Sequence, residues 1–448
     1  MLTVLAFLTA LTLLIFVHEY GHYRMARFCG VRVLRFSIGF GRVLWRWQPR
    51  GESTEFTLCA LPLGGYVRML DEREAPVPPE QRHLAFNVQP LARRALIVFA
   101  GPLANLVLAV LLYALVYWSG NMEPRPILAS PVAGSLAAGA GLVGGEQIEQ
   151  VQVPGEPAKA VRTMGELRWQ LTQAALEGRD IRLRTAQGRE FILPLEQLQA
   201  QEADAALMQR IGIGAPFTRP LIGELSEGGA AAKSGLMPGD LVLRVDGQPA
   251  VDGRWLREQI RASVRDGQAS TMRWRIARNG VELELQVSPS VVREGERLIG
   301  RIGAFVGGKP ELVNYRLGFV DGLWQAGAMT WETSVLSLRM IGRMVLGEAS
   351  LKNLSGPLTI ADYAGRSASV GLNQYLLFLA LISVSLGVLN LLPLPMLDGG
   401  HLMYYLWEAV TGRPLSDMWM ERLQRGGIAL LVVVMSIALF NDLVRLLG

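Results

Sequence analysis

Val17-His18-Glu19-Tyr20-Gly21-His22 ends an uncharged apolar run that begins at Met1. On a helix, His18 and His22 lie on the same face, where both imidazoles can bind one metal ion. Glu19 lies beside them, and a carboxylate there can take a proton from a water on that metal. Ionisable groups joined to a membrane-length apolar run are costly unless they have partners and a purpose. The pattern therefore predicts a metal site at a membrane span, with two histidines facing lipid headgroups as the alternative.

The composition is that of a membrane protein. The chain has 448 residues, of which 50% are hydrophobic. Apolar runs long enough to cross a bilayer lie within residues 1–24, 95–118 and 367–398, and a marginal one lies within residues 426–448. The first run has no basic start and no small-residue cleavage site, so we do not expect a removed signal peptide. The sequence predicts a polytopic α-helical membrane protein with about four transmembrane helices.

Arginine predicts the orientation in the membrane. Between Arg24 and Arg94 there are twelve Arg and no Lys, against six Asp or Glu. The positive-inside rule places residues 25–94 in the cytoplasm, and both termini and the long insert after the second span outside it. The excess of basic residues thus indicates how the chain is oriented in the membrane, and nothing indicates nucleic-acid binding. Cys29 and Cys59 both fall in the predicted cytoplasmic part, so no disulfide framework is expected in the insert.

Two features near the first spans predict local structure. Short strands are expected at residues 37–41, 43–47 and 55–61, and the alternation around Trp45 and Trp47 suits a membrane-associated hairpin, with a plain soluble hairpin as the alternative. In the second span, Gly101-Pro102 and Asn105 predict close helix packing, since a Pro in a spanning helix needs neighbours for the freed backbone groups. No direct catalytic role is expected for them.

The insert carries an internal repeat. Residues 140–146, Ala-Gly-Leu-Val-Gly-Gly-Glu, match residues 234–240, Ser-Gly-Leu-Met-Pro-Gly-Asp, at an offset of 94. This predicts two β-rich units at residues 122–216 and 217–308. The second resembles a PDZ domain of the bacterial protease type, and the first is a weaker match. Because PDZ grooves accept an extended peptide as an added strand, the pair could capture a peptide or could keep large substrates away.

Residues 309–366 are predicted to form an amphipathic helical segment that lies along the membrane or against the bundle. Apolar residues recur there at three- or four-residue spacing, which is typical of a helix. The stripe consists of Val320, Trp324, Ala328, Trp331, Val335, Leu338, Ile341 and Val345.

A second site feature ends the third span, where the sequence runs from Asn390 to Asp398 through Pro393 and Pro395. Because these prolines cannot continue a regular helix, we expect the backbone to open just before Asp398, as is tolerated where it lines a cavity. Asp398 is the candidate third metal ligand. It could instead cap the following helix, and His401 could ligate in its place. Residues 399–425 are expected to be a cytoplasmic loop.

Taken together, these residues resemble the site-2 protease family of intramembrane zinc metalloproteases, and within it the bacterial members with tandem PDZ domains. The resemblance implies that His18, His22 and Asp398 hold Zn²⁺, that Glu19 is the general base, and that Asn390 helps to seat the substrate. The motifs that carry it are residues 18–22, Gly101-Pro102 with Asn105, Ser355-Gly356-Pro357, and residues 390–399.

The resemblance also implies an activity. It predicts a zinc-dependent intramembrane endopeptidase of the bacterial inner membrane, with both termini and the PDZ domains in the periplasm. The implied substrate is the transmembrane segment of a single-span anti-sigma factor, already shortened by another protease, in an envelope stress response. A non-enzymatic membrane scaffold that captures peptides through its PDZ pair is the competing hypothesis. A metal transporter is disfavoured, because no chain of polar residues crosses the spans.

Overall fold

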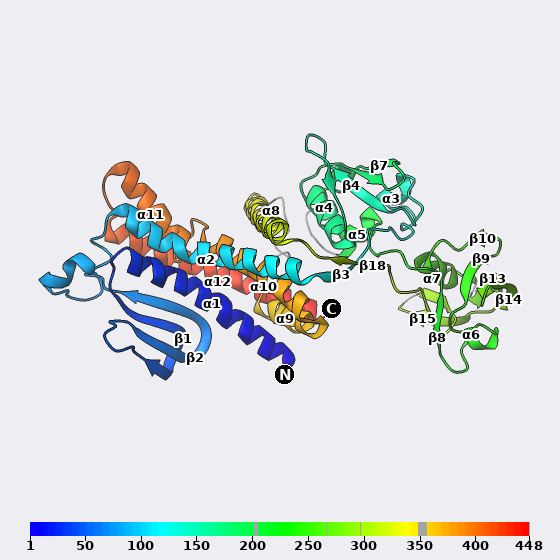
Figure 1. The fold of residues 1–448 in the computed structure, drawn as a ribbon, viewed down its shortest axis with the longest axis horizontal. Helices are drawn as coiled ribbons and strands as arrows, with labels where there is room; N and C mark the ends of the chain where they lie inside the picture. The colour runs from blue at the N-terminus through cyan, green and yellow to red at the C-terminus, as the bar shows by residue number, and fades with distance from the viewer. Residues whose placement is uncertain (201–204, 266, 296, 348–355, 448) are drawn as a thin grey trace. The chain divides into compact units, whose positions relative to one another are not determined.

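The computed structural model describes residues 1–200, 205–265, 267–295, 297–347 and 356–447. Ser355 of the predicted Ser355-Gly356-Pro357 motif lies outside them. The chain forms two units: Met1–Gly120 together with Arg316–Gly448, and Asn121–Tyr315. The first is helical apart from one sheet, and the second is rich in β-structure (Figure 1). The predicted fold class, membrane-spanning helices with β-rich domains, is confirmed.

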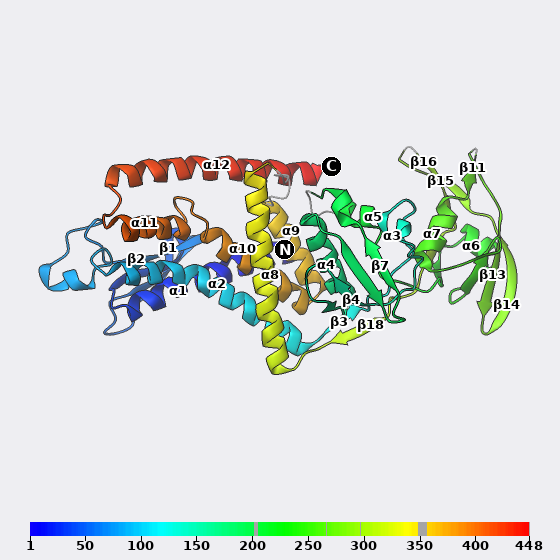
Figure 2. The ribbon, with the colours of Figure 1, turned by 90° about the horizontal axis from the view of Figure 1, so that it is seen from above.

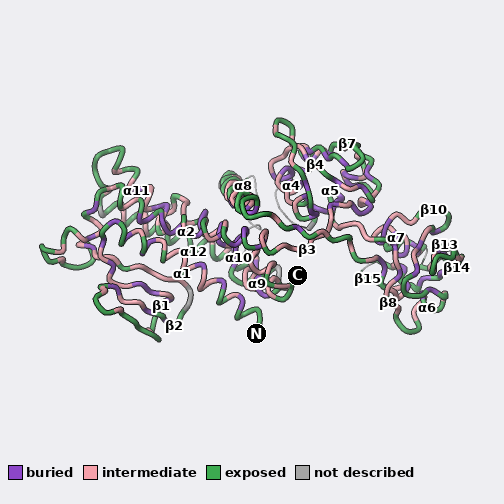
Figure 3. Tube along the Cα trace, viewed as in Figure 1, coloured by how far each residue is buried: buried purple, intermediate pink, exposed green. Residues whose placement is uncertain are grey.

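Within the described residues, four helices are long and apolar enough to cross a membrane. They are α1 (Leu2–Phe28), α2 (Leu91–Ser119), α10 (Leu372–Asn390) and α12 (Asp417–Leu447). α1, α2 and α10 pack through small residues that bury a core of alanines between them. A side chain on Gly21 of α1 would collide with the Ala100 carbonyl of α2, and one on Gly387 of α10 would lie 3.1 Å from the Pro102 carbonyl oxygen. The outer faces of these helices are exposed, as lipid-facing surfaces would be (Figure 3).

The predicted third span, residues 367–398, contains the candidate membrane helix α10, and the helix ends before Asp398, where the prolines predicted an opening of the backbone. α9 (Pro357–Val370) ends at Gly371, whose φ of +147° is open to glycine but strained for other residues, and α10 begins at Leu372. α10 ends at Asn390, and a turn that contains both prolines leads into α11 (Asp398–Thr411). Residues 399–425, predicted as the cytoplasmic connection between the third and fourth spans, contain most of α11 and the start of α12.

One sheet packs beside α1 (Figure 1). It consists of β1 (Val33–Trp47) and β2 (Glu55–Met69), longer strands than the short ones predicted. Residues 33–38 pair with residues 65–69 and with residues 55–58, and residues 43–47 pair with residues 56–59, so the two strands make a sheet of four segments. Phe36 and Tyr23 are buried where the sheet meets α1, while Trp45 and Trp47 are about half exposed. The 3₁₀ helix η1 (Pro79–Leu84) carries His83, which is exposed.

α8 (Phe319–Val345) runs across α2 (Figure 2). Its start is fixed to the end of α2, because Trp118 stacks on Phe319 with ring centroids 4.6 Å apart and donates a hydrogen bond to the Phe319 carbonyl. Ala326 and Thr330 are buried, whereas Trp324 and Trp331 of the predicted apolar stripe are 80% and 71% exposed. The stripe thus faces away from the bundle.

A buried carboxylate attaches α12 to α9. Asp442 of α12 is 1% exposed. It accepts hydrogen bonds from the backbone N–H groups of Gly356 (2.9 Å), Leu358 (2.9 Å) and Thr359 (3.2 Å), which are among the donors that a helix start leaves unpaired. Much of the remaining surface of α12 is exposed.

The second unit contains two sheets with the same strand order, β5-β4-β6-β7 and β10-β9-β13-β14. The repeat predicted from the sequence is therefore visible in the structure, although the domain boundaries stay predictions. Buried acids end the repeated motif in both copies: Glu146 accepts from the N–H of Gly144, and Asp240 from that of Met237. Asp252 is fully buried and joins the copies, since it caps α7 and accepts hydrogen bonds from the N–H and hydroxyl groups of Ser130.

The elements of this unit follow in chain order. The first half has β3 (Asn121–Pro124), α3 (Leu136–Gly139), β4 (Ile148–Gln152), β5 (Lys159–Ala160), α4 (Met164–Leu176), β6 (Ile181–Thr185), β7 (Glu190–Leu193), η2 (Leu195–Leu198) and α5 (Ala205–Ile211). The second half has β8 (Ile222–Leu225), α6 (Ala230–Lys233), β9 (Leu241–Val245), β10 (Gln248–Pro249), α7 (Gly253–Arg261), β11 (Val264–Arg265), β12 (Gln268–Ala269), β13 (Met272–Arg278), β14 (Val281–Val287), β15 (Ser290–Glu294), β16 (Arg297–Arg301), β17 (Ala304–Val306) and β18 (Leu312–Tyr315).

Replacing Asp442 by Ala should destabilise the helical unit by about 2–4 kcal/mol, because several buried N–H groups lose their acceptor. The thermal unfolding midpoint of the full chain in detergent measures this. Glu421→Ala is the matched control, since Glu421 lies on the same helix and pairs with Arg425 at an exposed surface, where the loss is small. Equal midpoints for the two variants would contradict the role given to Asp442.

The second unit should lose stability at acid pH through Asp240. Burial raises the pKa of this carboxyl, but hydrogen bonds from Arg278 and from the Met237 N–H outweigh it and hold the pKa below its ordinary value. The carboxylate therefore stabilises the fold above the unfolded-state pKa of about 4, and this contribution is lost as pH falls through the lower folded value.

Hydrogen exchange of residues 235–245 in the full chain tests this prediction. At pH 7, Asp240→Asn should exchange faster than wild type, by an amount equivalent to about 1–3 kcal/mol. The difference should shrink below about pH 4. A difference that stays the same at both pH values would show that the charge of Asp240 does not matter.

Candidate metal centre

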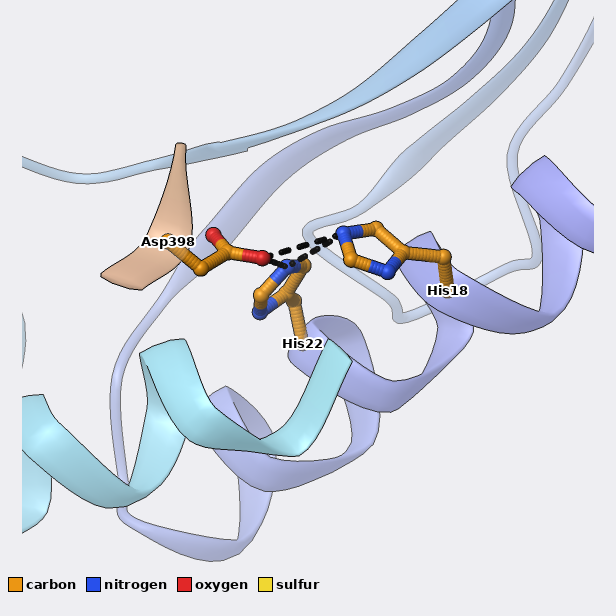
Figure 4. A group of neighbouring side chains, drawn as sticks. All are labelled: His18, His22 and Asp398. Carbon is orange, nitrogen blue, oxygen red and sulfur yellow. Dashed lines mark hydrogen bonds and ion pairs between the residues drawn. The ribbon is translucent and has the colours of Figure 1, made fainter. Parts of the chain in front are cut away.

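Three side chains that are far apart in the sequence meet inside the helical unit. His18 and His22 come from α1 and Asp398 from the start of α11 (Figure 4). The distance between the two Nε2 atoms is 3.2 Å, and Asp398 Oδ2 lies 3.2 Å from His18 Nε2 and 3.5 Å from His22 Nε2. The structure thus brings the three predicted metal ligands together.

A backbone carbonyl fixes the orientation of His22. The buried imidazole makes a hydrogen bond of 2.8 Å from Nδ1 to the carbonyl oxygen of Ile97 on α2. A carbonyl oxygen can only accept, so Nδ1 carries the proton and the lone pair of Nε2 is free to bind a metal.

His18 has a side-chain partner instead. Its Nδ1 lies 3.2 Å from the amide nitrogen of Asn105, one turn after Gly101 on α2. Asn105 is fully buried, and its backbone carbonyl accepts a hydrogen bond of 2.7 Å from the Ser383 hydroxyl of α10. α2 therefore supplies the outer partners of both histidines.

The turn after α10 delivers Asp398. Met396 has a φ of +83°, and side chains on Gly399 and Gly400 would collide with the backbone of Leu392 and Leu394, so the turn is tightly folded. Leu397 occupies the N-cap position of α11, and Asp398 is the first helical residue. The carboxylate points at the two imidazoles (Figure 4).

The other end of α11 is fixed to α2 by an ion pair. Arg94 of α2 and Glu408 of α11 are 2.6 Å apart, and both side chains are largely buried. His401, the alternative ligand, has its ring edge-on to Tyr404 and lies outside the three-residue cluster. α2 therefore contacts α11 through this ion pair, in addition to its hydrogen bonds to His18 and His22.

The cluster fits a zinc ion. Two imidazoles and a carboxylate are a ligand set that catalytic zinc uses, and a tetrahedral ion with bonds of about 2.0–2.1 Å keeps its ligand atoms about 3.3 Å apart. The observed separations of 3.2–3.5 Å agree with this spacing. Oδ2 of Asp398 is a buried carboxylate oxygen that faces both Nε2 atoms, an arrangement that one cation held between the three side chains would explain.

A glycine makes room for the cluster. A side chain on Gly101 would collide with the His22 ring and lie 2.9 Å from Cε1 of His18. The sequence pattern Gly101-Pro102 with Asn105 had indicated only close packing. Gly101, Asn105 and Ile97 in fact border the cluster directly. The four-residue spacing of Gly101 and Asn105 puts them on one face of a helix. This spacing was the feature of the sequence that could have indicated that both residues border the cluster.

The two remaining predicted site residues lie nearby in the fold. Glu19 is partly buried between α1 and β2, where a side chain on Gly65 would lie 2.9 Å from Glu19 Cγ. Asn390 is the last residue of α10 and is partly buried. The hydrogen bonds of the described residues do not link its side chain to the cluster.

Comparison with known proteins identifies the family. The model of peptidase family M50 matches residues 6–434. A putative zinc metalloprotease of Ralstonia nicotianae is 44% identical over 464 residues, covering 100% of this chain and 99% of that one. The regulator of sigma-E protease of Escherichia coli is 38% identical over 457 residues, covering 98% of each chain.

A putative zinc metalloprotease of Neisseria meningitidis is similar over its full length as well, at 39% identity over 457 residues. These matches extend through all four candidate membrane helices. The chain therefore belongs to peptidase family M50, the site-2 protease family of multi-pass intramembrane zinc metalloproteases.

Proposed function

We propose that His18, His22 and Asp398 hold the catalytic zinc, that Glu19 is the general base, and that the substrate is the transmembrane segment of a single-span membrane protein. The observation that carries the proposal is the meeting of the three ligand atoms at 3.2–3.5 Å, between α1 and α11. A zinc ion held there supplies a Lewis acid that polarises a peptide carbonyl and acidifies a bound water.

Glu19 moves the protons. It follows His18 directly on α1, so its carboxylate projects from a neighbouring face of the same helical turn. From there it accepts a proton from the attacking water and returns one to the amine that leaves when the peptide bond breaks. A side chain on Gly65 of β2 would lie 2.9 Å from Glu19 Cγ, so Glu19 lies beside the sheet, which supports this role.

The substrate must be extended where it is cut. The carbonyls of a transmembrane helix are occupied by its own hydrogen bonds, so the segment has to unwind before one of them can react. β2 passes beside Glu19, and an added strand along this sheet would present a peptide bond near the base. Asn390, the last residue of α10 before the turn that leads to Asp398, offers amide hydrogen bonds to the same extended segment.

The protein that carries this segment is, we propose, an anti-sigma factor already shortened by another protease. A full-length relative bears the name regulator of sigma-E protease, which supports a role in an envelope stress response. The PDZ-like repeats at residues 122–216 and 217–308 would capture the trimmed end of the substrate or exclude untrimmed proteins.

The proposed location is the bacterial inner membrane. Residues 25–94 carry the arginine excess and face the cytoplasm. Both termini and the β-rich unit then lie in the periplasm. The lipid bilayer surrounds the four spans, and the exposed Trp324 and Trp331 of α8 suit contact with its surface.

Glu19→Gln should abolish proteolysis but keep zinc. We expect cleavage of a tagged single-span model substrate in liposomes to fall by at least about 100-fold, with zinc content unchanged. Asp398→Ala and His22→Ala should lose both the bound zinc and the proteolysis. A zinc chelator should stop cleavage by the wild-type protein. Zinc at wild-type stoichiometry in both ligand variants would exclude this assignment of the site.

Gly101→Ala should lose zinc for a steric reason. The added methyl collides with the His22 ring, so zinc affinity should fall by about 10–100-fold, as for other disturbed ligand shells. Gly327→Ala is the matched control, because a side chain at that helical glycine meets nothing within 4 Å. Unchanged affinity in Gly101→Ala, measured by competition with a fluorescent zinc indicator, would contradict the packing described.

A further inference from the structure

We infer that Asn105 is a positioning residue that sets which nitrogen of His18 carries the proton, and thereby whether His18 can bind metal. The inference rests on the proposed zinc role of His18. It starts from a difference between the two histidines: His22 faces a backbone carbonyl at 2.8 Å, whereas His18 faces a side-chain amide at 3.2 Å.

The carbonyl of Ile97 allows only one arrangement. It cannot donate, so His22 always keeps its proton on Nδ1 and its Nε2 lone pair free. The side-chain amide of Asn105 allows two arrangements. It carries a donor, the NH₂ group, and an acceptor, the carbonyl oxygen, and a rotation of the amide by roughly 180° about the Cβ–Cγ bond exchanges their positions.

Each amide orientation selects one form of His18. When the NH₂ group donates to Nδ1, the proton of His18 is on Nε2, where it points towards Asp398 Oδ2 at 3.2 Å. When the carbonyl oxygen faces Nδ1, it accepts the proton there, and the Nε2 lone pair is free. Only the second form leaves Nε2 of His18 able to bind zinc. Zinc binding therefore requires the Asn105 amide to rotate while the His18 proton changes from Nε2 to Nδ1.

The surroundings show that Asn105 is not there for packing. It is fully buried, and within the described residues its Oδ1 has no hydrogen-bond partner. A leucine of similar size would fill the same space without an unpaired polar atom. Among the residues that the structure describes, the NH₂ group of the side chain is bonded to His18 alone, which links the amide to that imidazole.

Zinc affinity of the metal-free full chain in detergent, measured by competition with a fluorescent zinc indicator, tests the inference. Asn105→Leu should weaken zinc binding by about 10–100-fold. Asn105→Asp, which can only accept from Nδ1, should bind zinc at least as tightly as wild type. The metal-free unfolding midpoint of Asn105→Leu should equal or exceed that of wild type, which a purely structural role would not predict.

Ser383→Ala is the matched control. Ser383 bonds the backbone carbonyl of Asn105 and not the imidazole, so its loss should leave zinc affinity within about twofold. If Asn105→Leu does not fold, Asn105→Ala replaces it, with the same loss expected. Wild-type affinity in the Leu or Ala variant, or a loss in Asn105→Asp as large as theirs, would overturn the inference. A wild type that binds no zinc would instead overturn the proposed function.

Discussion

The close crossing of α1 and α2 is the contact on which the site depends. Gly21 lets α1 approach the backbone of α2, and Gly101 lets the two imidazoles fit against it. At any larger separation, His22 would lose the Ile97 carbonyl and His18 would lose Asn105. An apolar helix pair with two glycines at its crossing thus accommodates a cluster of polar side chains in the interior of a membrane protein.

Three carboxylates inside the helical unit have definite partners. Asp398 faces two imidazoles, Glu408 faces Arg94, and Asp442 faces the start of α9. Buried charges without partners would be far more costly than any packing they replace. The same pairings also connect the elements: Arg94 of α2 pairs with Glu408 of α11, α11 carries Asp398, and Asp442 bonds α12 to the start of α9.

The sequence predicted that His18, His22 and Asp398 would meet, and the structure brings them together. His18, Glu19 and His22 could be recognised because their spacing on one helix is chemically informative, and Asp398 because it is an acid directly after an uncharged run. The partners Ile97 and Asn105 could not, since a backbone carbonyl has no sequence signal and their proximity arises only when α1 and α2 pack.

The boundaries were harder for a physical reason. An apolar run indicates which residues can enter a membrane, but it does not indicate where a helix breaks. The break at Gly371, inside residues 367–398, was therefore missed. A helix after Asp398 was considered only as an alternative in which Asp398 caps it, and α11 (Asp398–Thr411) is present with Asp398 as its first helical residue. The stabilising contact of Asp442 joins segments 83–86 residues apart, which local patterns cannot reveal.

X-ray absorption at the zinc edge of the loaded full chain tests the ligand set most directly. Two imidazoles and a carboxylate predict nitrogen and oxygen neighbours at about 2.0–2.1 Å, the outer-shell scattering of two rings, and no sulfur at about 2.3 Å. A spectrum with one ring, or with the sulfur of Cys29 or Cys59, would show that His18, His22 and Asp398 do not hold the zinc.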